Sequence, residues 1–254
     1  MKEKTVIQLS VQSTGVAVAF GVNGSGLITD GTGEGVTTSL SVCEWIMPGA
    51  NALSGIIYLP PGKTSTDDAK VSAKILRTDE WGEPVAGAEP LAVFEWAASA
   101  SARYPLPVTI AFESAEESPA SLWKDAEAVK KLSDSDKKDI LEQVDGFRLA
   151  MMSGDAGRAF ELSASKYKDM VAIYKATPEA YKKALERQVK FIAQAPEKPK
   201  KLELEHAAFA LIAGGRVVMV SAGNRPAITL STEDFDIEIS VYCAKIDGSW
   251  VICR

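Results

Sequence analysis

The sequence predicts two domains: an all-β, sandwich-like domain over residues 1–115, and an α+β domain over residues 133–254 with three helices and an antiparallel sheet. Residues 116–132 are predicted as a linker and a short helix. Two observations support this division. Up to about residue 113, short runs rich in Val, Ile and Thr alternate with turn-forming residues, a pattern typical of antiparallel sandwiches. After the linker-like ESAEESPAS (113–121), the apolar residues recur every three or four positions, as in helices.

Short apolar runs in the first domain predict its strands: TVIQLSV (5–11), GVAVAFGV (15–22), VTTSLSVCEWIM (36–47), SGIIYL (54–59), KVSAKILRT (70–78) and LPVTIAF (106–112). PLAVFEWAASASA (90–102) fits a strand or a helix, and we favour a strand that ends near Trp96. GKT (62–64) lacks the glycine that a phosphate loop has five positions earlier, where this chain has Ile57. We therefore expect an ordinary turn there. We also expect turns and bulges in the glycine-dense segment 21–35.

Helix signals fill the middle of the chain. SLWKDAEAVKKL (121–132) predicts a short helix, and Ser133 then provides a cap for a longer one. Gly154, within Ser153-Gly154-Asp155, ends that helix, and a second one runs through Tyr167. Thr177-Pro178 starts a third helix, because proline is favoured at the first helical position. Two apolar stripes at helical spacing define the buried faces: Ile140, Val144, Phe147 and Met151, then Tyr181, Leu185, Val189 and Ile192.

Four antiparallel strands are predicted after the helices: KLELEHAAFAL (201–211), RVVMVSA (216–222), FDIEISVYCA (235–244) and SWVICR (249–254). If Asp247-Gly248 forms a two-residue loop, Cys243 lies opposite Ile252. One face of these strands then carries Ile237, Ile239, Val241, Cys243, Trp250 and Ile252, and we expect this face to contact the helices. The other face carries Asp236, Glu238, Ser240, Tyr242, Val251 and Cys253. Because Cys243 and Cys253 lie on opposite faces, no disulfide is expected between them.

The stretch GFRLAMMSGDAGRAFEL, the following helix and strands, and the closing DGSWVICR resemble the nuclear transport factor 2-like (cystatin-like) superfamily over about residues 133–254. Members share a small-residue-plus-Asp break between the first two helices and a Gly-x-Trp pattern in the last strand, matched here by Gly248-Ser249-Trp250. The resemblance implies an α+β cone, with three helices on a strongly curved sheet. The first domain resembles no family that we can name.

Candidate site residues follow from these faces and from the resemblance. His206 alternates in phase with Leu202 and Leu204, so its side chain is expected to point into the cone. Members of the resembled family bind small molecules there. The alternative is that His206 is an ordinary core residue whose hydrogen bonds are satisfied within the protein. Tyr181, Trp250 and Cys243 complete the predicted ligand pocket. Tyr242, Val251 and Cys253 are the predicted interface, used for a homodimer or for docking against the first domain. No catalytic residue is predicted, because Asp236 and Glu238 fall on the outward face.

Composition narrows the function classes further. The net charge of −6 and the absence of a basic half argue against nucleic-acid binding. The sequence contains no run of about 18 apolar residues, so no membrane span is expected. The chain has three scattered cysteines and a single histidine. These are too few for a disulfide framework or a metal site, and no cofactor is expected. The first residues lack the apolar core of a signal peptide, so a cytoplasmic protein is expected, although a chain trimmed of its signal would look the same.

These observations favour a non-enzymatic binding or interaction protein with a small-ligand pocket in the cone. One alternative is an isomerase- or hydratase-like enzyme that uses the same pocket, which would need a deep cavity holding an ionisable group with a shifted pKa. A second alternative is an envelope or extracellular binding module whose β domain recognises a carbohydrate or a protein.

Overall fold

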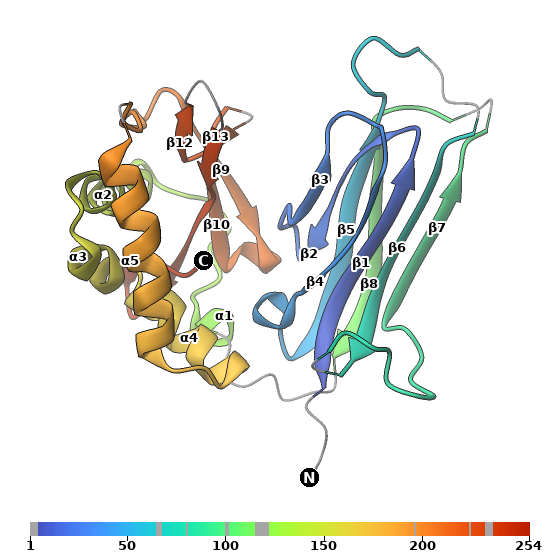
Figure 1. Ribbon diagram of the computed structural model, residues 1–254, viewed down its shortest axis with the longest axis horizontal. Helices are drawn as coiled ribbons and strands as arrows, with labels where there is room; N and C mark the ends of the chain where they lie inside the picture. Colours follow the sequence, from blue (N-terminus) through green and yellow to red (C-terminus); the bar gives the residue numbers. More distant parts are fainter. Residues whose placement is uncertain are drawn as a thin grey trace. The chain divides into compact units, whose positions relative to one another are not determined.

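The computed structural model describes residues 5–64, 68–79, 81–99, 102–114, 122–195, 197–223, 225–231 and 236–254. The chain divides into two units, residues 1–118 and 119–254, which are described separately (Figure 1). Over its described residues, the first contains only strands and one short 3-10 turn, and the second combines helices with antiparallel strands. The predicted linker over 113–121 lies almost entirely outside the described residues.

Two four-stranded antiparallel sheets form the first unit. One has the order β4-β1-β6-β7 and the other β3-β2-β5-β8. The strands of the first sheet are β1 (Val6–Thr14), β4 (Val36–Ser41), β6 (Lys70–Thr78) and β7 (Ala92–Ala97). Those of the second are β2 (Ala17–Val22), β3 (Ile28–Asp30), β5 (Gly49–Tyr58) and β8 (Leu106–Ser114).

The buried faces of these two sheets meet, as in a β-sandwich. Alternate residues of β1, such as Leu9 and Val11, are fully buried, as is Phe20 of β2. The ring of Phe20 lies 6.0 Å from that of Phe94 in β7, so the contact joins the two sheets. The all-β prediction for this half is confirmed, and so is the strand that ends near Trp96.

Three local differences separate this unit from its prediction. The strand expected over 36–47 ends at Ser41, because Cys43–Trp45 forms a 3-10 turn. The strand expected over 54–59 starts earlier, at Gly49, and a short strand, β3, lies within the glycine-dense segment. The GKT segment forms a turn, as expected, closed by a 3.1 Å hydrogen bond from the N–H of Lys63 to the carbonyl of Pro60.

The helices of the second unit are α1 (Leu122–Asp125), α2 (Asp134–Ser153), α3 (Ala156–Leu162), α4 (Ala164–Tyr174) and α5 (Pro178–Gln194). Their caps agree with the sequence. Ser133 and Asp136 form a reciprocal capping box at the start of α2, and Gly154 ends it with a φ of 79°. The hydroxyl of Thr177 accepts from the N–H of Ala180 in the first turn of α5, and proline occupies the start of that turn.

Two helix predictions are corrected. The helix expected over 121–132 ends at Asp125, because the next residues bond to distant backbone: Glu127 N–H donates to Lys245 O in a strand and Val129 N–H to Gly215 O in a 3-10 turn, both at 2.9 Å. The helix expected to run through Tyr167 is two helices. Ser163 separates them, and its hydroxyl donates back to the carbonyl of Ala159 at 2.6 Å.

An antiparallel sheet in the order β9-β10-β14-β15 completes this unit. Its strands are β9 (Ala207–Ile212), β10 (Val217–Ala222), β14 (Val241–Ile246) and β15 (Ser249–Ile252). Short β11 (Arg225–Pro226) pairs antiparallel with the end of β10. The strand predicted over 235–244 is interrupted at Ser240, so that β13 (Asp236–Ile239) forms a separate hairpin with β12 (Ile228–Ser231), which was not predicted. The predicted register of the last hairpin is confirmed, with Cys243 opposite Ile252 and Lys245 opposite Trp250.

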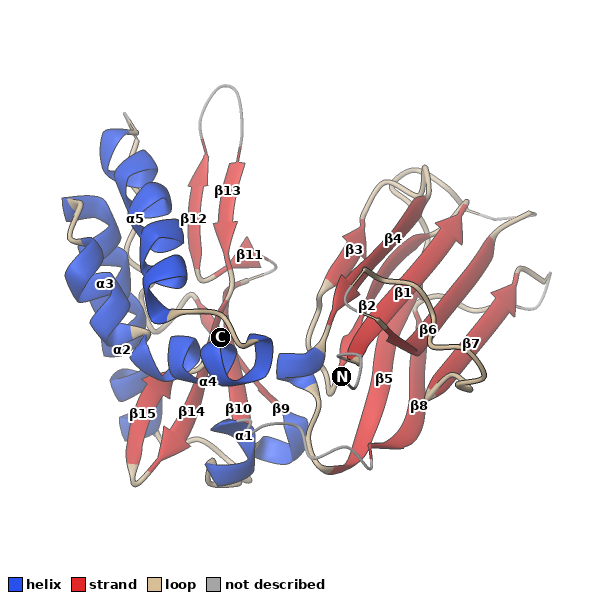
Figure 2. Cartoon of the chain, turned by 60° about the horizontal axis from the view of Figure 1, so that its bottom comes forward, coloured by secondary structure: helices blue, strands red, loops and turns tan. Residues whose placement is uncertain are grey.

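Helices α2, α3 and α5 cover one face of these strands (Figure 1 and Figure 2). The predicted apolar sheet face contributes to the core at every position: Ile237, Ile239, Val241, Cys243, Trp250 and Ile252. Both predicted helix stripes pack against it. Burial of such side chains contributes roughly 1.5–3 kcal/mol each to folding, so this interface holds the unit together.

Candidate functional site

His206 lies outside the core of the second unit, contrary to its expected position. Strand β9 starts at Ala207, and a turn precedes it, closed by a 3.0 Å bond from the N–H of His206 to the carbonyl of Glu203. The strand alternation with Leu202 and Leu204 therefore does not exist. The imidazole is 71 % exposed and lies 3.8 Å from the carboxylate of Glu205. The structure places His206 on the surface, where it lines a shallow groove.

The other three predicted pocket residues pack within the hydrophobic core. Cys243 is fully buried and Trp250 nearly so, and the indole N–H of Trp250 donates to Asp136 at 2.9 Å. Tyr181 is half-buried against the same core; its ring lies 5.6 Å from that of Tyr167. Trp250, Cys243 and Tyr181 thus share one packed helix–sheet interface, and His206 does not join them.

The predicted interface residues are not all accessible. Tyr242 is 4 % exposed and Cys253 is fully buried, while Val251 is half-buried. Cys253 follows β15 and lies beside the indole of Trp123 in α1. Its neighbour Arg254 pairs with Asp169 of α4, and its guanidinium lies 5.5 Å from the ring of Trp123. Cys253 is thus enclosed by side chains of its own unit, and the interface role of Tyr242 and Val251 stays a prediction.

Two buried thiols and two buried phenols of this unit stay protonated at neutral pH. Burial raises the pKa of the Cys253 thiol to about 12, and it raises the pKa of the Cys243 thiol as well. Burial also raises the pKa of Tyr167 and of Tyr242. An acid–base or nucleophilic group needs a pKa near the working pH, so these four side chains are poorly suited to such chemistry.

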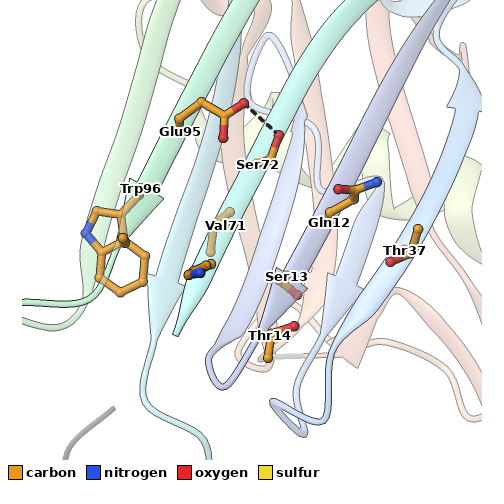
Figure 3. Close-up of a pocket in the computed structure, with 10 residues that line it drawn as sticks. Gln12, Ser13, Thr14, Thr37, Val71, Ser72, Glu95 and Trp96 are labelled. Carbon is orange, nitrogen blue, oxygen red and sulfur yellow. Dashed lines mark hydrogen bonds between the residues drawn. The ribbon is translucent and has the colours of Figure 1, made fainter. Parts of the chain in front are cut away.

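A polar hollow lies on the face of sheet β4-β1-β6-β7 that points away from the sandwich core, with a volume of about 630 Å³ (Figure 3). Its centre is one row of side chains across all four strands: Thr37, Gln12, Ser72 and Glu95. The pairing puts Gln12 opposite both Thr37 and Ser72, and Ser72 opposite Glu95. Side chains on the same face of paired strands lie about 5 Å apart, so the row is continuous.

Glu95 is held as a carboxylate at one end of this row. Lys74 lies 2.8 Å from it, and the hydroxyl of Ser72 donates to it at 3.1 Å. The hydrogen bond from Lys74, supported by that from Ser72, lowers the pKa of Glu95 against a smaller opposing effect of burial. The row therefore offers, in order, a hydroxyl, an amide, a hydroxyl and an anionic acceptor.

Further side chains extend the lining around the row. In the next row, Thr14 pairs with Lys70, and both belong to the hollow. Trp96 alternates away from Glu95, but it sits on the edge strand β7 and contributes to the lining (Figure 3). Its indole packs edge-on against Tyr104, with ring centroids 6.2 Å apart. The hollow thus combines closely spaced hydrogen-bonding groups with one aromatic side chain at its rim.

This hollow was not predicted from the sequence, although each of its strands carries polar residues at alternate positions. The four residues of the row occupy polar positions in strands that alternate between apolar and polar side chains: Gln12, Thr37, Ser72 and Glu95. Polar positions of this kind normally face water and do not by themselves indicate a site. Their grouping depends on the register between strands that are far apart in the sequence, such as β1 with β4 and β6.

Comparison of the chain with models of protein families, with curated proteins and with solved structures found no match. Within the described residues, no helix is both long and apolar enough to cross a membrane. Over the same residues, no group of three or more His, Cys, Asp or Glu side chains is placed to hold a metal ion.

Proposed function

We propose that this chain is a non-enzymatic binding protein whose first unit recognises a carbohydrate in the polar hollow of sheet β4-β1-β6-β7. The observation that carries the proposal is the continuous row of Thr37, Gln12, Ser72 and Glu95, whose spacing follows from the strand register. A sugar ring presents hydroxyl groups on neighbouring carbons, and each can donate and accept. A row of mixed donors and acceptors matches this pattern.

Each part of the hollow has a role in this proposal. The Gln12 amide, at the centre, supplies both a donor and an acceptor, and the Glu95 carboxylate accepts from sugar hydroxyls. The ammonium group of Lys70 adds donors near Thr14. Trp96, at the rim, provides an apolar ring surface against which the C–H face of a sugar can lie. The backbone of paired strands holds these groups in place, which reduces the ordering cost of binding.

Glycan-array screening of the full chain, followed by calorimetry with the best oligosaccharide, tests the proposal. Gln12→Ala removes the central amide, and we expect binding to weaken by roughly 3–10-fold, as for the loss of one hydrogen bond. Thr37→Ala should weaken binding in the same direction. The matched control is Thr109→Ala, which makes the same change at an exposed position on β8 in the other sheet.

Two results would contradict carbohydrate recognition in this hollow. One is that no oligosaccharide binds the intact chain. The other is that Thr109→Ala weakens binding as much as Thr37→Ala does, which would place the ligand elsewhere.

We further propose that residues 133–254 form a nuclear transport factor 2-like cone. The support is the cluster of α2, α3 and α5 on one face of an antiparallel sheet, with Trp250 in its last strand buried beneath them. In this proposal the interior contributes stability, since Trp250 and Cys243 are core side chains. An experimental structure superposed on members of that superfamily tests the assignment, and a sheet of different strand order would overturn it.

A further inference from the structure

A basic groove lies on the surface of the second unit, apart from its hydrophobic core. It has a volume of about 430 Å³ and runs between the irregular segment 197–206 and the strands β10, β11 and β12. Its charged lining consists of Lys198, Lys200, Lys201, Arg225, Glu197 and Glu203, with His206 beside them. Four cations stand against these two carboxylates and against Glu238, which pairs with Arg225, so the groove carries a charge of +1 before His206 is counted, although the whole chain carries −6. The positive charge is therefore a local feature.

The segment that forms one wall of this groove is anchored at successive points. The ammonium group of Lys198 donates to the carbonyls of Ile192, Ala193 and Ala195, at 3.2, 2.6 and 2.7 Å, which closes the C-terminal end of α5. The next residue, Pro199, is buried, and its carbonyl accepts from the guanidinium of Arg148 at 2.9 Å.

That anchor is itself fixed within the unit. Arg148 is 7 % exposed and forms a 2.7 Å ion pair with Asp145. Leu202, further along the segment, packs against the hydrophobic core. Lys200 and Lys201 thus extend from a backbone held on both sides.

The opposite wall also has an ordered cation. Arg225, in β11, donates to Glu238 of β13 at 3.2 Å, so its guanidinium is held beside the groove. The hydroxyl of Thr229 donates to the carbonyl of Pro226 at 3.1 Å and stabilises the turn between β11 and β12. Both walls therefore present basic groups from backbone that is already ordered, which lowers the entropic cost of binding an anion.

We infer that this groove binds a small soluble anion that carries phosphate groups. Phosphate oxygens accept several hydrogen bonds at once, and Lys and Arg are the side chains that proteins use for them. The two carboxylates of the lining favour a compact ligand over a long polyanion, because they repel negative charge on either side of the cations.

Calorimetry with inorganic pyrophosphate and the full chain, at low ionic strength, tests this inference. The double variant Lys200→Gln, Lys201→Gln should weaken pyrophosphate binding at least about tenfold, since charge-assisted hydrogen bonds contribute that much. The control is Lys183→Gln, Lys190→Gln on the exposed face of α5, which removes the same charge from the same unit. This control should change binding less than about twofold.

Three outcomes would overturn the inference. The intact chain does not bind pyrophosphate, or both double variants weaken binding equally, as diffuse electrostatics would. In a parallel sedimentation assay with vesicles containing phosphatidic acid, binding to the vesicles without binding to pyrophosphate would show a lipid surface as the partner.

Discussion

The indole N–H of Trp250 donates a 2.9 Å hydrogen bond to the carboxylate of Asp136, which links the last strand to the first turn of α2. The same carboxylate closes the capping box with Ser133 and receives the ammonium group of Lys245 at 3.2 Å. The Asp136 carboxylate thus accepts hydrogen bonds from the start of the helix, from a buried indole and from an ammonium group. These contacts fix the position of the final hairpin relative to the helices.

Replacement of Asp136 should therefore destabilise the second unit. Asp136→Asn removes the charge and weakens all three interactions, and we expect a loss of roughly 1.5–3 kcal/mol in the free energy of unfolding, measured in urea. Asp139→Asn is the control, since Asp139 lies in the same helix and is exposed. Equal losses from both substitutions would mean that the contribution comes from helix charge alone.

The contribution of Asp136 should depend on pH. Its hydrogen bonds with the side chain of Ser133, then with Trp250, lower its pKa below the ordinary value of 3.8. A depressed pKa in the folded state stabilises the protein above the unfolded pKa, and this stabilisation is lost as the pH falls through the folded pKa. The difference in unfolding free energy between the natural chain and Asp136→Asn should stay constant from about pH 7 to 5 and shrink below 3.8. A difference that grows on acidification would show the opposite shift.

Cys243 and Cys253 should resist alkylation in the folded protein. Both are fully buried, and burial raises the pKa of each thiol, that of Cys253 to about 12. Since the thiolate is the reactive form, iodoacetamide at about pH 8 should modify neither until the chain is unfolded. Mass spectrometry of peptides from native and urea-treated samples measures this. Modification of Cys253 at equal rates in both samples would contradict its placement under Trp123.

Gly154 should be intolerant of alanine for a backbone reason. Its φ of 79° lies in the left-handed region, while an added Cβ would meet only Ala193 at an ordinary 3.5 Å. Gly154→Ala should therefore destabilise the unit by about 1 kcal/mol. The control is Gly146→Ala within α2, where the nearest side chain is also at an ordinary distance, 3.6 Å. Thermal unfolding should show this second variant to be equal to or more stable than the natural chain, because alanine favours a helix interior.

Asn23 should be important for the first unit. Its amide donates to the carbonyl of Trp45 at 2.8 Å and to the side chain of Asn51 at 2.9 Å, and its side-chain oxygen accepts from the N–H of Ala52. Asn23→Gly keeps the left-handed backbone at this position but removes all three bonds. We expect a loss of roughly 1–3 kcal/mol in urea denaturation, since buried partners are left unsatisfied. A loss below about 0.5 kcal/mol, typical of a surface change, would contradict this role.

Local signals in the sequence were sufficient for many elements. Ser133, Gly154 and Thr177-Pro178 set helix ends because caps and breakers act on adjacent backbone groups. Asp247-Gly248 set the register of the last hairpin for the same reason, and alternation then placed Trp250 and Ile252 on the core side. These features need only a few neighbouring residues.

Tertiary structure decided what depends on distant segments. A turn displaced His206 from the expected strand to the surface groove, and the backbone of Glu127 and Val129 bonded to distant backbone instead of forming a helix. Cys253 became buried because Trp123 of α1 and Asp169 of α4 lie beside it, which a period-two pattern does not encode. The row of Thr37, Gln12, Ser72 and Glu95 exists only because four strands, separated by loops, pair in one register. The sequence by itself determined where chain segments bend, start and bury a face, and only long-range pairing determined which polar side chains meet.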